Sequence, residues 1–295
     1  MDIDADLARR LVAQQFPAWA DLPVRPVDLP GWDNRTFRLG DTMSVRLPSA
    51  AHYVAQVEKE QVWLPRLAPY LPLPIPAPIA LGQPGEGYPY PWSVYGWIPG
   101  RPSAADTMGD TVRFATALAE FLRAFESIDA ADGPPPGEHN FHRGGALAVW
   151  DDQARAALGI LRGRIDTDVA RRVWDDALAT TWTSDPVWVH GDVGPNNLLV
   201  DDAGRLTGVI DFGGCGVGDP ACDLTIAWQV FDGPSRAVFR HAMDLDDGTW
   251  ARARGWALWK AMIVAAGMIG TVSPMPTRSW GVLDRVLADG GRDRR

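Results

Sequence analysis

The polar residues between positions 188 and 213 have the types and the spacing that suit transfer of a phosphoryl group. His190 and Asp192 are followed by Asn197, and Asp211 directly precedes Phe212. The order H-x-D-x-x-x-x-N and then D-F-G is that of sites in which an Asp orients an attacking hydroxyl and accepts its proton. An Asn and a second Asp hold Mg²⁺ on the nucleotide phosphates. All three residue types are present in the required order.

The residues between these two motifs predict a short hairpin that would bring the motifs together. Residues 198–200 are apolar, residues 201–204 read Asp-Asp-Ala-Gly, and residues 206–210 are again mostly apolar. Two apolar runs separated by turn residues favour a hairpin, whose second strand would deliver Asp211 beside Asp192. An ordinary surface hairpin with solvated acids is the simpler interpretation. The presence of the residue types needed for phosphoryl transfer at both ends of the hairpin argues against it.

In these motifs the chain resembles the aminoglycoside phosphotransferases, with choline, homoserine and macrolide kinases as relatives. The family writes the loop as HGDxxxxN and the metal motif as IDF or IDW, and this chain has both. The resemblance implies that Asp192 is the catalytic base and that Asn197 and Asp211 are metal ligands. It also implies an α+β, bilobed, protein-kinase-like fold. In that fold a small N-terminal lobe, with an antiparallel sheet plus a helix, precedes a larger, mostly helical C-terminal lobe.

Two further positions extend the resemblance. Gly191 stands where regulated protein kinases place an Arg that reads a phosphorylated activation loop, which implies an enzyme that needs no phosphorylation. Residues 218–224 resemble the GDPxxDL segment of the family. Asp219 before Pro220 is typical of a helix start, because the carboxylate accepts from first-turn amides and Pro needs no partner there. The resemblance implies that Asp223 braces backbone amides of the catalytic loop.

The first ninety-five residues carry the elements expected to bind a nucleotide. We expect a helix over residues 4–16 and a strand over 24–29, followed by two strands joined by a turn rich in Gly, Asp and Asn at 31–41. In a kinase such a loop covers the phosphates, because small and polar residues let backbone amides approach the oxygens. Asn34 is our candidate nucleotide contact in this loop.

The strand predicted over residues 43–47 carries an unusual phosphate clamp. A kinase normally has a Lys there, whereas this chain has Arg46; among 28 Lys and Arg residues, lysine occurs only at Lys59 and Lys260. An Arg fork still grips phosphate, although it is longer and less adaptable than Lys. We expect Arg46 to be the clamp and Lys59 to be the alternative.

The helix predicted over residues 52–67 is expected to supply a carboxylate partner for this clamp. The resembling family pairs a helix Glu with the phosphate-binding cation. Glu60 is our choice, because it lies one turn before the apolar pair Trp63 and Leu64, and Glu58 is the second choice. Solvated helix charges are the competing interpretation for either residue.

A Pro-rich stretch leads to residues 92–100, which resemble the strand and hinge between the lobes. The carbonyl of Gly96 and the amide of Ile98 are expected to bind the nucleotide base through the backbone, so the sequence leaves ATP and GTP open. The lobes are predicted to span residues 1–95 and 96–295. Apolar periodicity predicts helices in the second lobe at 111–128, 147–161, 169–180, 224–231, 236–243 and 250–269. In the resembling family the last of these form the acceptor site.

Composition and net charge indicate which classes of binding partner are expected. The 295 residues are 46% hydrophobic, enough to bury a large core, and the net charge of -9 argues against nucleic acid, which requires clustered basic charge. It slightly favours a cationic or neutral acceptor over an anionic one. Two cysteines predict no disulfide framework, and the N-terminus shows no secretory signal. The most apolar late segment, about fifteen residues long, is short for a membrane span. A cytoplasmic monomer or weak dimer is expected.

Three functions remain open from the sequence. The leading one is an ATP- or GTP-dependent O-phosphotransferase acting on a hydroxyl of an aminoglycoside-type antibiotic or related compound, with macrolide, amino-alcohol or sugar kinases of the same fold as alternatives. The second is a catalytically silent nucleotide-binding module, which Arg46 makes conceivable. The third is a metal-dependent hydrolase using His190 and the acids, which the absence of a second paired motif argues against.

Overall fold

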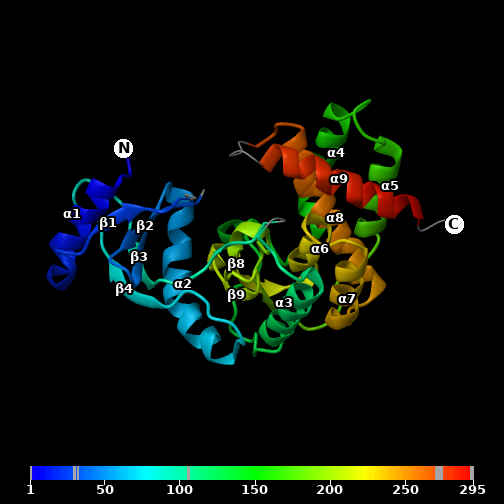
Figure 1. Cartoon of the computed structure of the whole chain (residues 1–295). Coiled ribbons are helices and arrows are strands. Elements are labelled where there is room, and N and C mark those ends of the chain that lie inside the picture. Colours follow the sequence, from blue (N-terminus) through cyan, green and yellow to red (C-terminus); the bar gives the residue numbers. More distant parts are fainter. Residues whose placement is uncertain (1, 29–30, 32, 105–106, 270–274, 293–295) are drawn as a thin grey trace.

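The chain folds into two lobes that lie side by side (Figure 1). A computed structural model describes residues 2–28, 31, 33–104, 107–269 and 275–292. The first lobe is built on an antiparallel sheet with two helices, and the second is mostly helical. The expected α+β, bilobed architecture is therefore confirmed.

A five-stranded antiparallel sheet with the strand order β1-β2-β3-β5-β4 forms the first lobe. Its strands are β1 (Val24–Pro26), β2 (Asn34–Leu39), β3 (Met43–Pro48), β4 (Pro78–Gly82) and β5 (Trp92–Gly96). Helix α1 (Ala5–Gln15) packs at one end of the sheet, and α2 (Val54–Leu67) lies on the side that faces the second lobe (Figure 1). The central strand β3 pairs with β2 and β5, so Arg46 lies in the middle of the sheet.

Helix α1 begins where the sequence predicts it. The side chain of Asp4 accepts a hydrogen bond of 2.8 Å from the amide of Leu7, which satisfies a first-turn donor. Leu7 and Leu11 recur at helical spacing and are buried in the same apolar cluster as Phe37 and Val45 of the sheet. This apolar contact stabilises the outer layer of the first lobe.

The predicted turn over residues 31–41 is wrong, because most of it is strand β2. Phe37 and Leu39 alternate with more exposed neighbours and pack into the core, so the apolar alternation outweighs the Gly, Asp and Asn content. The actual turn follows at Gly40, whose φ of 58° favours glycine. Strand β1 ends at Pro26, earlier than predicted, and Trp32 of the predicted loop lies outside the described residues.

The second lobe contains two small antiparallel sheets, in the orders β6-β8-β9 and β10-β7. Their strands are β6 (Arg101–Pro102), β7 (Val187–Val189), β8 (Leu198–Val200), β9 (Leu206–Val209) and β10 (Gly216–Gly218). The predicted hairpin is present as β8 and β9. Both ends of this hairpin therefore carry the candidate catalytic residues.

Helices cover these sheets on the side away from the first lobe (Figure 1). They are α3 (Thr111–Glu126), α4 (Asp151–Ile160), α5 (Thr167–Leu178), α6 (Ile226–Gln229), α7 (Gly233–Met243), α8 (Asp247–Ala265) and α9 (Met275–Arg292). Helix α8 is buried on most of its sides and contacts α4, α5 and α9. Helix α9 was not predicted, and the helix predicted at 224–231 is present in shortened form as α6, which follows a 3₁₀ helix over Pro220–Thr225.

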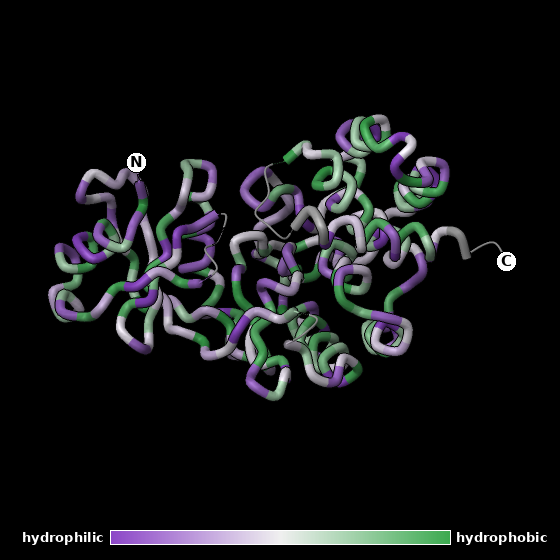
Figure 2. The backbone as a smooth tube through the Cα atoms, turned by 45° about the horizontal axis from the view of Figure 1, so that its top comes forward, coloured by the Kyte–Doolittle hydropathy of each residue, from purple (hydrophilic) through white to green (hydrophobic). Residues whose placement is uncertain are grey.

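Each lobe has its own apolar core, and Figure 2 shows hydrophobic stretches in both. Leu64 and Leu67 at the end of α2, with Tyr95 of β5, belong to the core of the second lobe. The end of α2 thus anchors the first lobe on the second, and the lobe boundary at residue 95 stays a prediction. Within the residues that the structure describes, no helix is long and apolar enough to cross a membrane.

Candidate active site

His190 organises the loop that carries the candidate base. Its Nε2 lies 3.0 Å from the carbonyl oxygen of Ile210, and its Nδ1 lies 3.2 Å from the amide nitrogen of Asp192. Nε2 therefore carries the proton and donates to Ile210, while Nδ1 accepts from Asp192. The imidazole ring also packs against the ring of Phe212, with the two ring centroids 4.6 Å apart. One imidazole thus joins the catalytic loop to the segment that ends in Asp211.

Asp192 is held by the Asn that the sequence places five residues later. The side-chain amide of Asn197 donates to the backbone oxygen of Asp192 at 2.9 Å and to its Oδ2 at 3.0 Å. The carbonyl oxygen of the same side chain is then available to a cation. The amide of Ile210 also bonds to the backbone oxygen of Asn197, at 2.9 Å, so the two motifs are tied together through the main chain.

Asp211 follows this hairpin in a left-handed conformation. Its φ of 69° and ψ of 64° are uncommon for a residue other than glycine, and such conformations concentrate at functional sites. Its Oδ1 accepts a hydrogen bond of 2.6 Å from Nη2 of Arg46. The candidate metal ligand and the candidate phosphate clamp are therefore in direct contact across the two lobes.

Arg46 also pairs with Glu60 of α2, at 3.2 Å, as the resemblance implied. Glu60 is 5% exposed and additionally accepts a hydrogen bond from the hydroxyl of Tyr95, whereas Glu58 is exposed. Although burial alone would lower the pKa of Arg46, the charges of Glu60 and then Asp211 raise that pKa above its ordinary value. Arg46 is therefore a fixed cation in the site.

Lys59 faces a different part of the molecule. Its Nζ donates to the carbonyl oxygens of Gly213 at 2.6 Å and Cys215 at 2.9 Å, and it lies 3.4 Å from Nδ1 of His139. This arrangement argues against Lys59 as the alternative phosphate clamp. The side chain instead ties α2 to the loop that follows Asp211.

Asp223 braces the catalytic loop, as the resemblance implied. Its two carboxylate oxygens accept from the amides of His190 at 2.6 Å and Gly191 at 2.7 Å. Gly191 has a φ of 82°, and a Cβ added there would lie 2.5 Å from the carbonyl oxygen of Gly214. Any larger residue, including the Arg of regulated kinases, would be excluded by this packing.

Asp219 starts the following helix and pairs with the second lobe's central helix. Its side chain accepts from the amide of Ala221 at 3.0 Å, the cap expected from the sequence. The same carboxylate accepts from Nε of Arg252 in α8 at 2.6 Å, and both side chains are buried. This ion pair joins the segment after the catalytic loop to α8. Removing either partner would leave the other as an unpaired buried charge, which is strongly destabilising.

The segment before β2 brings a carboxylate into the site beside the predicted Asn34. Asn34 is buried at the start of β2, and its role in nucleotide binding stays a prediction. Asp33 accepts from Nε2 of Gln56 at 3.1 Å. Burial, followed by the nearby charge of Asp211, raises the pKa of the Asp33 carboxyl to about 6. Asp33 therefore lies within electrostatic reach of the candidate metal site.

The hinge runs from the end of β5 onto the hairpin of the second lobe. Gly96 ends β5, and its amide bonds to the backbone oxygen of Ala77 at 2.9 Å. A Cβ added to Gly208 of β9 would lie 2.9 Å from the side chain of Ile98, so the hinge packs on that hairpin. Base binding by the Gly96 carbonyl and the Ile98 amide stays a prediction.

The donor atoms around Asp211 suit a hard cation. Asp211 and Asn197 both offer oxygen, and Mg²⁺ is usually held by one or two carboxylates together with substrate phosphates. Among the described residues, three His, Cys, Asp or Glu side chains are nowhere grouped so as to hold a metal by themselves. The residues therefore fit a magnesium ion that the nucleotide helps to bind.

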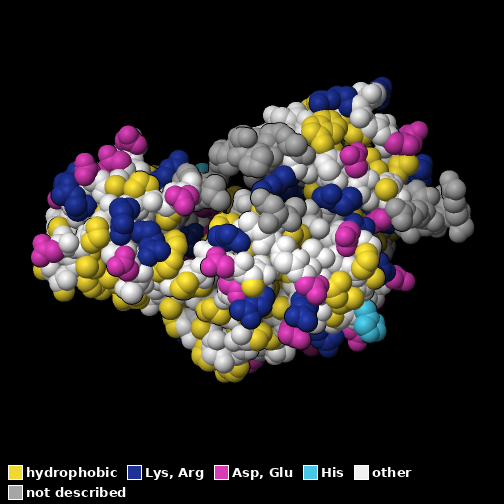
Figure 3. Space-filling model, viewed as in Figure 1, with side chains coloured by type: hydrophobic (Ala, Val, Ile, Leu, Met, Phe, Trp, Pro, Cys, Tyr) yellow, Lys and Arg dark blue, Asp and Glu magenta, His cyan; other side chains and the backbone are white. Residues whose placement is uncertain are grey.

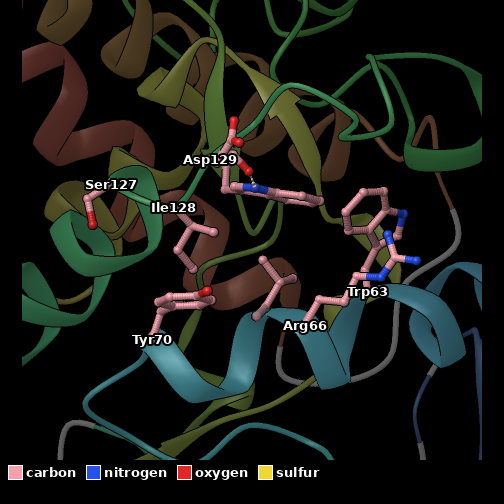
Figure 4. A pocket seen from close by; sticks show the side chains of 8 residues that line it. Trp63, Arg66, Tyr70, Ser127, Ile128 and Asp129 are labelled. Carbon is pink, nitrogen blue, oxygen red and sulfur yellow. Dashed lines mark hydrogen bonds between the residues drawn. The ribbon is translucent and has the colours of Figure 1, made fainter.

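A separate hollow of about 320 Å³ lies where α2, α3 and β7 meet. Figure 4 shows Trp63 and Arg66 of α2, and Tyr70 of the 3₁₀ helix that follows it, on the side opposite Ile128 and Asp129. The indole of Trp188 closes one side and donates to the backbone oxygen of Asp129 at 3.0 Å. Its lining includes no candidate site residue, so we assign it no part in the chemistry.

Several charged residues near the catalytic loop were not singled out by the sequence. Arg143 packs on Gly191, Arg278 of α9 donates to Oδ1 of Asn196 at 3.2 Å, and Lys260 of α8 is within electrostatic reach of Asp192. They come from three segments far apart in the chain, and no local motif marks them. Only the packing of the second lobe brings them together.

Comparison with known proteins places this geometry in a family. Residues 24–256 match the model of the phosphotransferase enzyme family. An aminoglycoside 3'-phosphotransferase of Streptomyces fradiae is 34% identical over 149 residues, which are 46% of this chain and 52% of that protein. A protein of the same name from Escherichia coli is 31% identical over 122 residues, 38% of this chain and 41% of that protein. The matches thus span about half the length of these curated relatives.

Solved structures extend the likeness over almost the whole chain. The GDP complex of an aminoglycoside 2'-phosphotransferase superposes with a TM-score of 0.73 at 17% identity, covering 97% of this chain and 99% of that one. A macrolide 2'-phosphotransferase from Brachybacterium faecium gives a TM-score of 0.60 at 23% identity, covering 95% and 98%. At these identities the structures show the shared fold. With the family match over residues 24–256, the chain belongs to the phosphotransferase enzyme family.

Proposed function

We propose that this protein transfers the γ-phosphoryl group of ATP or GTP to a hydroxyl group of a small molecule. The observation that carries the proposal is the joint placement of Asp192 and Asp211. Asn197 holds the first through its side-chain amide, and His190 bridges the loop to the segment that delivers the second. A surface hairpin would need none of these long-range contacts.

The residues divide the reaction between them. Asp192 would orient the acceptor hydroxyl and accept its proton as the oxygen attacks phosphorus. Arg46 would hold the α- and β-phosphates and Glu60 would hold Arg46, while Asp211 and Asn197 would bind Mg²⁺. When bound, that ion neutralises charge on the phosphates. The backbone of Gly96 and Ile98 would bind the base.

The acceptor is proposed from the relatives. Proteins named as aminoglycoside and macrolide phosphotransferases share the fold, so these antibiotics are the first acceptors to be tested. Amino alcohols and sugars are the alternatives within the same fold. Neighbouring structures were solved with GDP and with ADP, which supports a nucleotide and leaves the choice between ATP and GTP to measurement.

Nucleotide turnover tests the proposal. Purified protein is incubated with Mg²⁺ and ATP or GTP, with and without each acceptor, and formation of phosphorylated acceptor is followed. Asp192→Ala should abolish transfer while leaving nucleotide affinity unchanged, because the base acts on the acceptor. Positioned acid–base groups are typically worth about 10²- to 10⁴-fold. Retention of more than about a tenth of the rate would refute the role of Asp192.

The same experiment separates the second functional class. A silent nucleotide-binding module would bind Mg²⁺ and nucleotide but transfer nothing to any acceptor. Intact Asp192, Asn197 and Asp211 argue against that outcome.

A further inference from the structure

Arg143 is a buried cation beside the catalytic loop. It is 9% exposed, and a Cβ added to Gly191 would lie 3.0 Å from its Cβ, so its side chain starts directly against the catalytic loop. Its guanidinium lies over the rings of Trp256 and Trp259, at 5.0 and 5.3 Å. These rings hold the cation in place and supply a favourable face for it.

Lys260 lies on the face of α8 that carries these two tryptophans. Trp256, Trp259 and Lys260 occupy positions i, i+3 and i+4 of α8 and therefore share one face of that helix. Neither Lys260 nor the guanidinium of Arg143 makes an ion pair or hydrogen bond with another side chain of the described residues. Two cations thus lie together next to the catalytic loop without a direct carboxylate partner.

Burial and nearby charges of both signs act on Lys260. Burial lowers the pKa of Lys260, and the charge of Arg143 lowers it further, whereas Asp192 and Asp33 act in the opposite direction. Burial raises the pKa of Asp223, and the charge of Arg143 is one of several influences that oppose this rise, so part of the role of Arg143 is to balance that buried carboxylate. The carboxylates that favour the charge of Lys260 are Asp192 and Asp33, which both belong to the candidate active site.

A third cation borders the same loop. Arg278 of α9 donates to Oδ1 of Asn196, between the catalytic base and Asn197, and its side chain is otherwise exposed. Figure 3 shows Lys and Arg side chains on the second lobe close to its border with the first, with Asp and Glu side chains among them. The chain as a whole has a net charge of -9, and these three cations lie in a region that also contains the carboxylates of Asp192 and Asp33.

We propose that Arg143 and Lys260 form a binding site for an anionic group, a carboxylate or a phosphate, on the acceptor. The inference rests on the proposed function and names a class of acceptor for it. A polycationic acceptor would bring like charges against these side chains, which is unfavourable. An acceptor with a hydroxyl and an acidic group would place the hydroxyl at Asp192 and the acidic group at Lys260.

Four sugars with one ring and different charge test this directly. Glucose is neutral, glucuronate carries a carboxylate, glucose 6-phosphate carries a phosphate and glucosamine carries an amine. Their binding to the protein is measured with Mg²⁺ and a non-hydrolysable nucleotide analogue present, so that the nucleotide site is filled. One of the two anionic sugars should bind about ten- to a hundredfold more tightly than glucose, the usual effect of a charged hydrogen bond. Glucosamine should bind no better than glucose.

Variants assign the effect to the proposed residues. Lys260→Met should remove the preference for the anionic sugar, and Lys260→Arg should restore it in part. Arg66→Gln is the matched control, since Arg66 also lies over a tryptophan, Trp63, at 5.0 Å but borders the separate hollow. It should change nothing. Arg143→Lys keeps the charge at the buried position and should keep a weaker preference.

Defined outcomes overturn the proposal. Equal or unmeasurable binding of the four sugars, tighter binding of glucosamine, or an anionic preference that survives Lys260→Met would each refute it. A loss of nucleotide affinity in Lys260→Met with unchanged sugar binding would assign Lys260 to the transferred phosphoryl group instead. Nucleotide binding is measured in the same samples. Its absence would refute the proposed function alone, while an anionic preference dependent on Lys260 would still support this site.

Discussion

Nη2 of Arg46 lies 2.6 Å from Oδ1 of Asp211, so a cation from the first lobe and a carboxylate from the second meet in the middle of the site. The Arg46 side chain is 13% exposed and that of Asp211 is 33% exposed. With Mg²⁺ and nucleotide bound, Asp211 would turn to the metal and Arg46 to the phosphates. In the proposed function the ion pair would hold both groups near their working positions, and it would be exchanged for contacts with Mg²⁺ and phosphate when the nucleotide binds.

Replacing Arg46 should weaken nucleotide binding. Arg46→Ala removes a charged hydrogen bond to phosphate, which is worth roughly 1.5 to 3 kcal/mol, so the nucleotide KM should rise by about ten- to a hundredfold. Arg46→Lys should recover only part, because the ammonium is shorter and cannot fork. Arg25→Ala, which removes an exposed ion pair with Asp41, is the control and should leave KM unchanged. An unchanged KM in Arg46→Ala would show that the phosphates bind elsewhere.

Replacing Asp211 should weaken nucleotide binding only when magnesium is present. Asp211→Asn keeps the size of the side chain but lowers its affinity for a divalent cation. Nucleotide affinity is measured with Mg²⁺ and again in excess chelator. Equal weakening under the two conditions would mean that Asp211 acts through its contact with Arg46 and not through a metal.

The catalytic loop could be predicted from the sequence because its parts lie close together in the chain. His190, Asp192 and Asn197 are within eight positions, and the hairpin to Asp211 has clear turn chemistry. The prediction of a turn over residues 31–41 was wrong. Most of this segment forms strand β2 because this conformation buries Phe37 and Leu39, which outweighs its content of turn-forming residues. Local patterns therefore predicted the hairpin that brings the catalytic loop and Asp211 together, because its strands and turn lie close together in the chain.

The surroundings of the loop could not be predicted in the same way. Lys59 lies one position from Glu60 in the chain, yet it faces the carbonyls of Gly213 and Cys215 instead of the Arg46 site. Arg143 lies over Trp256 and Trp259 of α8, the helix that also carries Lys260, although Arg143 and Lys260 are 117 positions apart in the chain. Such contacts depend on how α2 and α8 pack against the rest of the protein. This packing leaves no local pattern in a single sequence.

Lys59 should matter for stability and for the position of Asp211. Lys59→Met leaves two buried carbonyl oxygens without their donor, which costs about 1 to 3 kcal/mol for each unsatisfied group. We expect a lower urea midpoint and a lower kcat, with less change in the nucleotide KM than Arg46→Ala shows. Glu58→Gln on the same helix is exposed and should change neither. A rise in KM matching that of Arg46→Ala, with normal stability, would make Lys59 a phosphate ligand after all.

Glu126 at the end of α3 should make stability depend on pH. Burial, followed by the charge of Asp223, raises the pKa of this carboxyl from an ordinary value of 4.5 to about 8. The folded protein thus keeps a proton that the unfolded chain loses near pH 4.5. The contribution of Glu126 to the free energy of unfolding is therefore full below about pH 4.5 and is lost as the pH rises to about 8. Glu126→Gln cannot ionise, so its unfolding free energy should fall less than that of the parent protein over this range. Urea unfolding at pH 5, 6.5 and 8.5 measures the difference, with the exposed Glu120→Gln as control. Parallel pH profiles for Glu126→Gln and the parent protein would show that Glu126 ionises normally in the folded state.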